Sequence, residues 1–346
     1  MRVSPATVLL TGLFFGAGLV SAEVPRLYQF AVRASEVDAR VRAHPEIDFL
    51  LEKNGKPADL EHASVDTRVE SVGKLVVWLM GYPPALFERV NSYGMHAIQV
   101  HYANGWFAKF GSGAPPADTQ TLGKIRLEAA TGEDVSPLVE IPKPDGMMER
   151  AFQLVRWLSE KNPEGKWAQF LNSDRSGLDW EKVVITGASH GATTSARFAL
   201  HQRVGRVVMF CGPRDQYEDW QGLESATPKE RFFGFSHVLD GGWKDDHYPR
   251  SWQLLGLHRF GPLVDVDKEQ PPYGHSRRLI TAADVAGDAK RAHSGIVPGG
   301  GAMKDAGGQF VHEAVWKYLF TSPVDKAGAP VEPEKGVRMD QRTPAK

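Results

Sequence analysis

The apolar positions of the chain fall into two kinds of segment. Residues 75–80 and 183–186 are short, continuous apolar runs, as expected of strands buried on both faces. Residues 85–92 and 147–158 instead repeat apolar side chains at helical spacing. The pattern also predicts strands at 96–101, 206–210, 231–236 and 278–282, and helices at 192–201, 250–257 and 310–320. This alternation predicts an α/β fold with a mostly parallel central sheet and helices on both faces.

Two long stretches interrupt the alternation. Residues 104–145 are rich in Gly and Pro, and residues 241–275 carry aromatic side chains among charges and prolines. Loops of this length in a compact domain are usually functional or mobile, so we expect both to be insertions over the active site. The aromatic side chains of Trp106, Phe107 and Phe110 either line a substrate cleft or pin the first insertion to the core.

The two ends of the chain differ from the part between them. A positive residue, an apolar run and the small residues 20–22 (Val-Ser-Ala) indicate a signal peptide over residues 1–22. The run is too short for a spanning helix, although an uncleaved anchor is the alternative. We therefore expect a secreted or periplasmic domain over 23–321, with no integral membrane segment after cleavage. Residues 322–346 are poor in large apolar side chains and are predicted to be a disordered tail.

Composition excludes several classes of protein. Lys and Arg number 41 against 42 Asp and Glu, so no basic excess suggests a nucleic-acid partner. The single cysteine, Cys211, excludes an internal disulfide framework and a multi-cysteine metal site. We expect it to be a small buried residue rather than a nucleophile.

The candidate chemistry lies at residues 187–191, which read Gly-Ala-Ser-His-Gly. The G-x-S-x-G pattern is weak alone, but here it joins a predicted buried strand to a helix of small residues. In such a tight turn Gly187 and Gly191 leave room for close backbone approach and Ser189 is held in a strained conformation. The pattern therefore indicates a nucleophile elbow with Ser189 as nucleophile, the alternative being a structural turn that contains serine.

With these residues in place, the sequence resembles the α/β-hydrolase superfamily from about residue 74 to residue 320. The resemblance implies a catalytic triad in the chain order Ser, acid, His. It also implies an oxyanion hole formed by the amide of His190 and an amide of the loop after strand 75–80. The prolines at 83 and 84 have no N–H, so only Gly81 and Tyr82 offer amides in this loop, and Tyr82 fits best. The Gly-Tyr pair at 81–82 resembles secreted cutinase-like and polyester-hydrolysing esterases, and the Tyr82 ring either covers the acyl side of a substrate or packs in the core.

The acid has two candidates. Asp240 follows strand 231–236 in an H-x-x-D segment that resembles the one delivering the triad carboxylate in the family. Asp215, after the preceding strand, is the rival, because some members place the acid there. His237 and Asp240 are also metal-ligand types, but no further ligands stand at suitable spacing, so we expect no metal site.

The base is chosen by position among 12 histidines. His293 lies in a loop of small residues between the last predicted strand and the last predicted helix, where the resemblance places the base. His312 is the competitor, but the spacing of 309–319 puts it inside the final helix, where a surface histidine is the simpler interpretation.

These roles predict a secreted serine hydrolase that cleaves small-molecule or polymeric esters through an acyl-enzyme and needs no cofactor. The alternatives are a serine peptidase or thioesterase on the same fold, or an inactive binding member.

Overall fold

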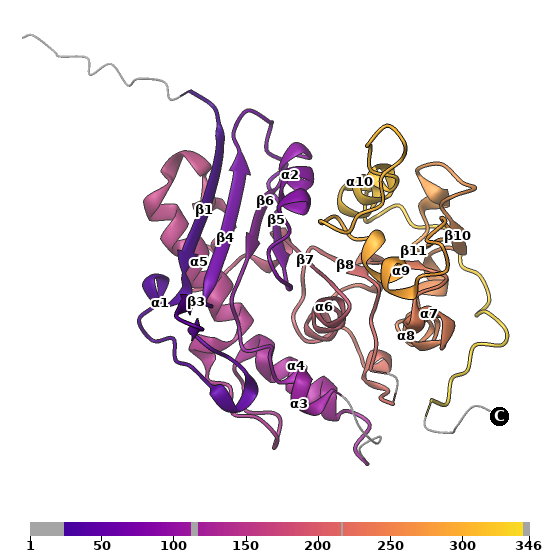
Figure 1. Ribbon diagram of the computed structural model, residues 1–346, viewed down its shortest axis with the longest axis horizontal. Coiled ribbons are helices and arrows are strands. Elements are labelled where there is room, and N and C mark those ends of the chain that lie inside the picture. Colours follow the sequence, from indigo (N-terminus) through magenta and orange to yellow (C-terminus); the bar gives the residue numbers. More distant parts are fainter. Residues whose placement is uncertain (1–23, 112–116, 216, 342–346) are drawn as a thin grey trace, which may run out of the picture.

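The structure is a computed structural model that describes residues 24–111, 117–215 and 217–341 (Figure 1). The predicted signal peptide lies outside these residues. Within them no helix has both the length and the apolar character needed to cross a bilayer.

A nine-stranded sheet runs through the molecule in the order β1-β4-β6-β5-β7-β8-β9-β11-β10. Its strands are β1 (Leu27–Arg33), β4 (Leu60–Asp66), β5 (Leu75–Trp78), β6 (His96–Gln99), β7 (Val183–Ala188), β8 (Arg206–Phe210), β9 (Phe232–His237), β10 (Leu263–Asp265) and β11 (Arg278–Thr281). The strands from β6 to β10 are parallel, whereas β4 is antiparallel to both β1 and β6. A separate two-stranded hairpin pairs β2 (Glu52–Lys53) with β3 (Lys56–Pro57).

Helices cover both faces of this sheet, as predicted. They are α1 (Ala34–Val37), α2 (Pro84–Ser92), α3 (Phe107–Phe110), α4 (Thr121–Thr131), α5 (Met147–Lys161), α6 (His190–His201), α7 (Gly241–Lys244), α8 (His247–Leu254), α9 (Ala289–Gly295) and α10 (Glu313–Thr321). Figure 1 shows α2 and α10 on one side of the sheet and α4 and α6 on the other.

Neighbouring residues of the central strands explain the two layers. Ile185 and Val207 belong to the core beneath α4, α5 and α6, and the adjacent Val184 and Val208 belong to the core beneath α2 and α10. All four are buried, because successive side chains of a strand point to opposite faces. Their strands therefore read as continuous apolar runs, which is why the sequence reveals them.

Several elements lie where the apolar pattern predicted none. The antiparallel strands β1 and β4 add an edge to the sheet before residue 74. Helix α4 lies inside the stretch 104–145 that we expected to be a loop insertion, and it ends at Gly132 in the left-handed conformation (φ 73°). A glycine of this kind commonly terminates a helix.

Residues 322–341, part of the segment 322–346 that the sequence predicts to be a disordered tail, contact the domain in the structure. Arg277, in the loop before β11, donates hydrogen bonds to the carbonyls of Val324 and Lys326 at 3.0 and 2.9 Å. Arg278 of β11 donates to both carboxylate oxygens of Glu334 at 2.6 Å. Val324 also packs against the core, and buried arginines supply hydrogen bonds to the rest of the segment.

Candidate active site

Ser189 lies in a tight turn between β7 and α6. Its backbone angles are φ 52° and ψ −110°, a region that side-chain-bearing residues rarely adopt. The N–H of Ser189 donates to the carbonyl of Phe210 at 2.9 Å, and its carbonyl accepts from the N–H and hydroxyl of Thr193 at 3.0 and 2.8 Å. These bonds hold the serine in the strained turn that a nucleophile elbow requires.

The two glycines of the motif are required by close approach. A Cβ on Gly187 would stand 2.5 Å from the backbone carbon of Gly191. A Cβ on Gly191 would stand 2.6 Å from the carbonyl oxygen of Leu79 and 2.8 Å from the side chain of Met80. The start of α6 therefore packs directly against the end of β5, and the loop that begins with Gly81 and Tyr82 lies beside the elbow.

Tyr82 packs its ring against the domain. The ring stacks on His62 with centroids 4.0 Å apart and meets Phe87 edge-on at 4.8 Å. Of the two roles considered for the Tyr82 ring, these contacts correspond to packing in the core rather than to covering a substrate. The backbone N–H of Tyr82 donates to no acceptor among the described residues. The N–H of His190 is in the first turn of α6, where helical amides have no partner within the helix.

Asp240 follows β9 and begins α7. Its Oδ1 accepts from the N–H of Gly242 at 2.8 Å, and its side chain is only 3% exposed. Burial raises the pKa of this carboxyl, but hydrogen bonds from His293, Gly242 and Tyr248 and the charge of His293 outweigh it, so the net pKa lies below its ordinary value. The group is therefore a carboxylate at neutral pH.

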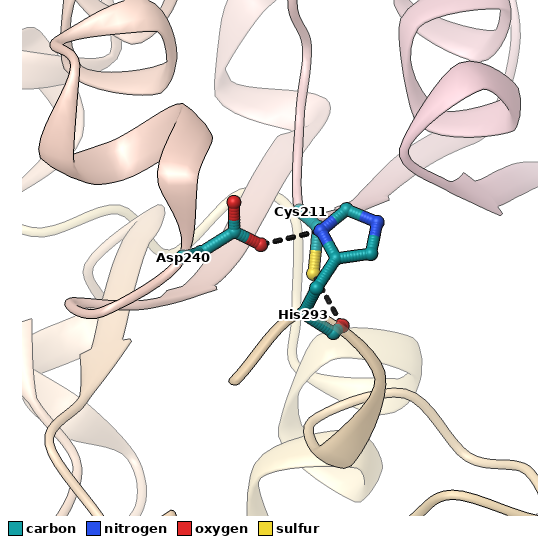
Figure 2. Close-up of side chains that lie close together, drawn as sticks. All are labelled: Cys211, Asp240 and His293. Carbon is teal, nitrogen blue, oxygen red and sulfur yellow. Dashed lines mark hydrogen bonds and ion pairs between the residues drawn. The ribbon is translucent and has the colours of Figure 1, made fainter. Parts of the chain in front are cut away.

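His293 meets that carboxylate, as Figure 2 shows. Its Nδ1 lies 2.5 Å from Oδ2 of Asp240, although the two residues are 53 positions apart in the chain. Because a carboxylate only accepts hydrogen bonds, Nδ1 carries a proton, and in the neutral imidazole Nε2 is then the acceptor. The His293 side chain is 36% exposed, so a reacting group can reach it.

His293 lies in helix α9 rather than in the loop that we expected. Asp288 caps this helix by accepting from the amides of Lys290 and Arg291 at 2.8 and 3.2 Å. An Asp before a short polar run that ends in Gly295 is a helix signature visible in the sequence. The imidazole is therefore carried by a short capped helix.

Cys211 lies against this pair (Figure 2). Its thiol donates to the carbonyl of His293 at 3.0 Å, and a Cβ on the next residue, Gly212, would stand 3.4 Å from the carbonyl of Ser189. Burial, with the charge of Asp240, raises the pKa of the thiol well above its ordinary value. Cys211 is therefore a neutral buried contact.

The same three side chains also have the donor types of a metal site. The possible ligand atoms of Cys211, Asp240 and His293 lie within 4.8 Å of one another. The carboxylate and the imidazole, however, are already hydrogen-bonded to each other, and the thiol is protonated. His237, the other ligand type considered from the sequence, is turned to the backbone: Nε2 donates to the carbonyl of Ala283 at 2.8 Å, and Nδ1 accepts from the amide of Leu239 at 3.0 Å.

The rival residues lie elsewhere. Asp215 is bonded to Arg126 through both carboxylate oxygens, each at 2.7 Å. His312 is the residue before α10 rather than a position inside it; its Nε2 lies 3.3 Å from the hydroxyl of Thr281. Burial lowers the pKa of His312 to about 4, so its imidazole is neutral. Neither side chain joins the Asp240–His293 pair.

The aromatic residues of the stretch 104–145 pack beside the elbow. Trp106 and Phe107 lie with ring centroids 5.1 and 4.7 Å from that of His190. Trp106 is buried and Phe107 is exposed. This part of the insertion therefore reaches the turn that contains Ser189.

Comparison with known proteins gives no close relative. No family model and no curated protein matches the chain. One solved structure of esterase B from Lactobacillus rhamnosis is 14% identical, over 57% of this chain and 52% of that one, with a TM-score of 0.26. The chain thus spans about half the length of that esterase structure. A second esterase B structure, with a tributyrin phosphonate, is 13% identical over 80% and 81% of the two chains, with a TM-score of 0.35.

An α/β serine hydrolase without a lid from Xanthomonas campestris is 9% identical over 53% and 67% of the two chains, with a TM-score of 0.29. Sequence and structural similarity this low gives no information about the activity of this chain. The fold class rests on the chain itself: a mostly parallel sheet covered on both faces, with a strand–Ser–helix elbow near its centre. This is the α/β-hydrolase arrangement expected from the sequence.

Proposed function

We propose that this protein is a serine hydrolase that cleaves carboxylic esters, with Ser189 as nucleophile, His293 as base and Asp240 as the carboxylate that orients His293. The observation that carries the proposal is the 2.5 Å contact between His293 Nδ1 and Asp240 Oδ2. Cys211 donates to the carbonyl of His293, and the residue before it, Phe210, accepts from the N–H of Ser189 in its strained turn. Nucleophile, base and orienting carboxylate are the three groups that acyl transfer needs.

The reaction follows from these roles. His293 Nε2 accepts the hydroxyl proton of Ser189 as the serine oxygen attacks the ester carbonyl. The amides of Tyr82 and His190 receive the resulting oxyanion, and the positive end of α6 favours its charge. The imidazolium, stabilised by Asp240, then protonates the departing alcohol. Water repeats the sequence on the acyl-enzyme and releases the acid.

Support for this oxyanion hole comes from the close approach at Gly191. The end of β5 and the start of α6 touch there, so the loop carrying the Tyr82 amide and the turn carrying the His190 amide stand side by side. Two donors from separate segments that converge on one point are the arrangement that stabilises a tetrahedral intermediate. A ring of Tyr82 that is stacked on His62 keeps that loop in place.

We further propose that the enzyme is exported and that its substrates are small or polymeric esters, as in the cutinase-like esterases that the Gly81-Tyr82 pair resembles. Export predicts a mature chain that begins at Glu23 after expression with the native leader in a secretion-competent host. Released protein whose intact mass still includes Met1 would contradict it.

The experiment for the activity is a panel of p-nitrophenyl esters and thioesters of increasing acyl length, set against aminoacyl p-nitroanilides. We expect ester turnover that disappears in Ser189→Ala while the circular dichroism spectrum is unchanged. Preference for the anilides or thioesters would identify a peptidase or thioesterase instead. A folded wild-type protein that turns over nothing in the panel and reacts with no fluorophosphonate would identify an inactive binding member.

A further inference from the structure

A buried arginine from the unpredicted helix α4 contacts the residue that follows the nucleophile. The side chain of Arg126 is 1% exposed, and its Nη1 donates to His190 twice: to Nδ1 at 3.0 Å and to the carbonyl oxygen at 3.2 Å. The same nitrogen lies 3.0 Å from the hydroxyl of Thr194, one turn further along α6. A single guanidinium thus holds both the backbone and the ring of His190.

Asp215 holds that guanidinium in turn. Its Oδ2 accepts from Arg126 Nε and its Oδ1 from Nη2, both at 2.7 Å, and the indole N–H of Trp220 donates to Oδ2 at 3.0 Å. The Asp215 side chain is 2% exposed. A bidentate ion pair of this kind fixes the plane and direction of the guanidinium, which a single hydrogen bond would not do.

The contact also determines the protonation state of His190. A guanidinium only donates, so Nδ1 accepts and the ring proton is on Nε2. Burial, together with the charge of Arg126, holds the pKa of His190 well below its ordinary value. Trp106 and Phe107 pack against the same imidazole and against the guanidinium, which lies 5.1 and 5.5 Å from their ring centroids. The ring is therefore neutral and fixed in orientation.

Both peptide groups that flank the α-carbon of His190 are held by hydrogen bonds, the first by Thr193 and the second by Arg126. The one before it, which carries the proposed oxyanion-binding N–H, has its carbonyl on Ser189 bonded to Thr193. The one after it has its carbonyl bonded to Arg126. An oxyanion donor works only within a few tenths of an ångström of its proper place, so the fixing of these two planes bears directly on catalysis.

We propose that Arg126 and Asp215 are a positioning pair for the oxyanion hole: they orient the His190 amide toward the intermediate without touching the substrate. This inference rests on the proposed esterase function. It gives Asp215, the rival candidate for the triad acid, a different role in the same reaction. It also makes part of the stretch 104–145 a component of the active site.

The test compares Arg126→Lys and Asp215→Asn with a matched control, Arg150→Lys. Arg150 is also fully buried and paired with a buried carboxylate, Glu61, at 3.2 Å, but its hydrogen bonds go to Glu61, Ala34 and Pro144 and none reaches the elbow. We expect kcat for the best ester to fall about 10- to 100-fold in the first two variants, with KM changed less than about threefold. Arg150→Lys should leave kcat within about threefold of the wild type.

A second readout separates positioning from general loosening. An alkylboronic acid forms a tetrahedral adduct with a nucleophilic serine, and that adduct places an oxygen in the oxyanion hole. Its inhibition constant should rise in parallel with the loss of kcat in Arg126→Lys and Asp215→Asn, but not in Arg150→Lys. Because Asp215→Asn removes a buried charge, Asp215→Glu serves as a second variant that keeps it, and we expect an intermediate loss of kcat.

A double-mutant cycle identifies the route through His190. If Arg126 acts partly on the ring, the losses of kcat in Arg126→Lys and His190→Ala will be less than multiplicative when combined. An active wild type whose kcat and boronate affinity are unchanged in folded Arg126→Lys and Asp215→Glu overturns the positioning role alone. A wild type that neither hydrolyses esters nor reacts with a fluorophosphonate overturns the proposed function and this inference together.

Discussion

Asp240 and His293 are joined by a 2.5 Å hydrogen bond between Oδ2 and Nδ1. Asp240 caps the start of α7, whereas His293 lies in the last turn of α9. The carboxylate is buried and the imidazole is partly exposed. One side of the ring is therefore fixed within the protein, while its other nitrogen is available for chemistry.

This relationship predicts different outcomes for the two aspartates. Asp240→Asn can donate to His293 and so favours the wrong tautomer, and we expect kcat to fall by about 10³- to 10⁴-fold with the fold intact. Asp215→Asn should cost only about 10- to 100-fold, because its effect passes through Arg126 and His190. Steady-state ester kinetics on both variants check this. A larger loss in Asp215→Asn would move the acid to the loop after β8.

The elbow glycines should be intolerant of even one methyl group. Gly191→Ala would push a carbon against the Leu79 carbonyl, and the expected cost is about 1 to 3 kcal/mol of unfolding free energy together with a loss of activity. Gly300→Ala is the control, since a Cβ there meets nothing within 4 Å. Urea unfolding of both variants measures the difference. Equal stability of the two variants would show that the turn has room for a methyl group at residue 191.

Stability should decrease as the pH falls from about 6.5 toward 4. Burial lowers the pKa of His312 to about 4, so between that value and the ordinary pKa of histidine the unfolded chain binds a proton that the folded chain does not. Protonation then favours unfolding. In His312→Gln the loss of unfolding free energy between pH 7 and pH 5 should be smaller by about 1 to 2 kcal/mol.

Urea titrations at the two pH values provide the measurement. His96, His101 and His247 also have pKa values lowered to about 4 by burial, whereas burial raises those of Glu61 and Glu218 to about 7 and opposes the trend. The comparison between variant and wild type isolates the part due to His312. An identical pH dependence in both proteins would contradict a neutral buried imidazole at this position.

The C-terminal segment should contribute to stability through Arg278. This guanidinium is 2% exposed and paired with Glu334, so Glu334→Gln leaves a buried cation with a weaker partner. We expect a loss of about 1 to 2 kcal/mol in unfolding free energy. Glu332→Gln, at an exposed position of the same segment, should change it by less than about 0.5 kcal/mol. Thermal unfolding of the two variants distinguishes a docked segment from a free tail.

The fold and the elbow could be predicted because their evidence is local. Continuous apolar runs mark strands such as β7, and small residues with glycines mark the turn at Ser189. Helix α4 escaped prediction because its buried face includes Arg126 and Glu128, which interrupt the apolar periodicity. The contribution of Arg126 to the site depends on a partner 89 residues away, a pairing that no local pattern contains.

The sequence also could not decide between Asp240 and Asp215, since both follow a buried strand. Their partners distinguish them: one carboxylate meets an imidazole and the other a guanidinium. Nor could composition reveal that residues up to 341 dock on the domain, because they are held mainly by hydrogen bonds from buried arginines rather than by apolar side chains.

The role of Ser189 is tested most directly by reacting the wild-type protein with a fluorophosphonate probe and locating the modification by peptide mass. We expect one phosphonylated residue, Ser189, formed at a rate that falls by orders of magnitude in His293→Ala and to nothing in Ser189→Ala. Circular dichroism would show that both variants remain folded. Modification at another residue, or undiminished labelling in folded Ser189→Ala, would contradict the assignment of Ser189 as the nucleophile.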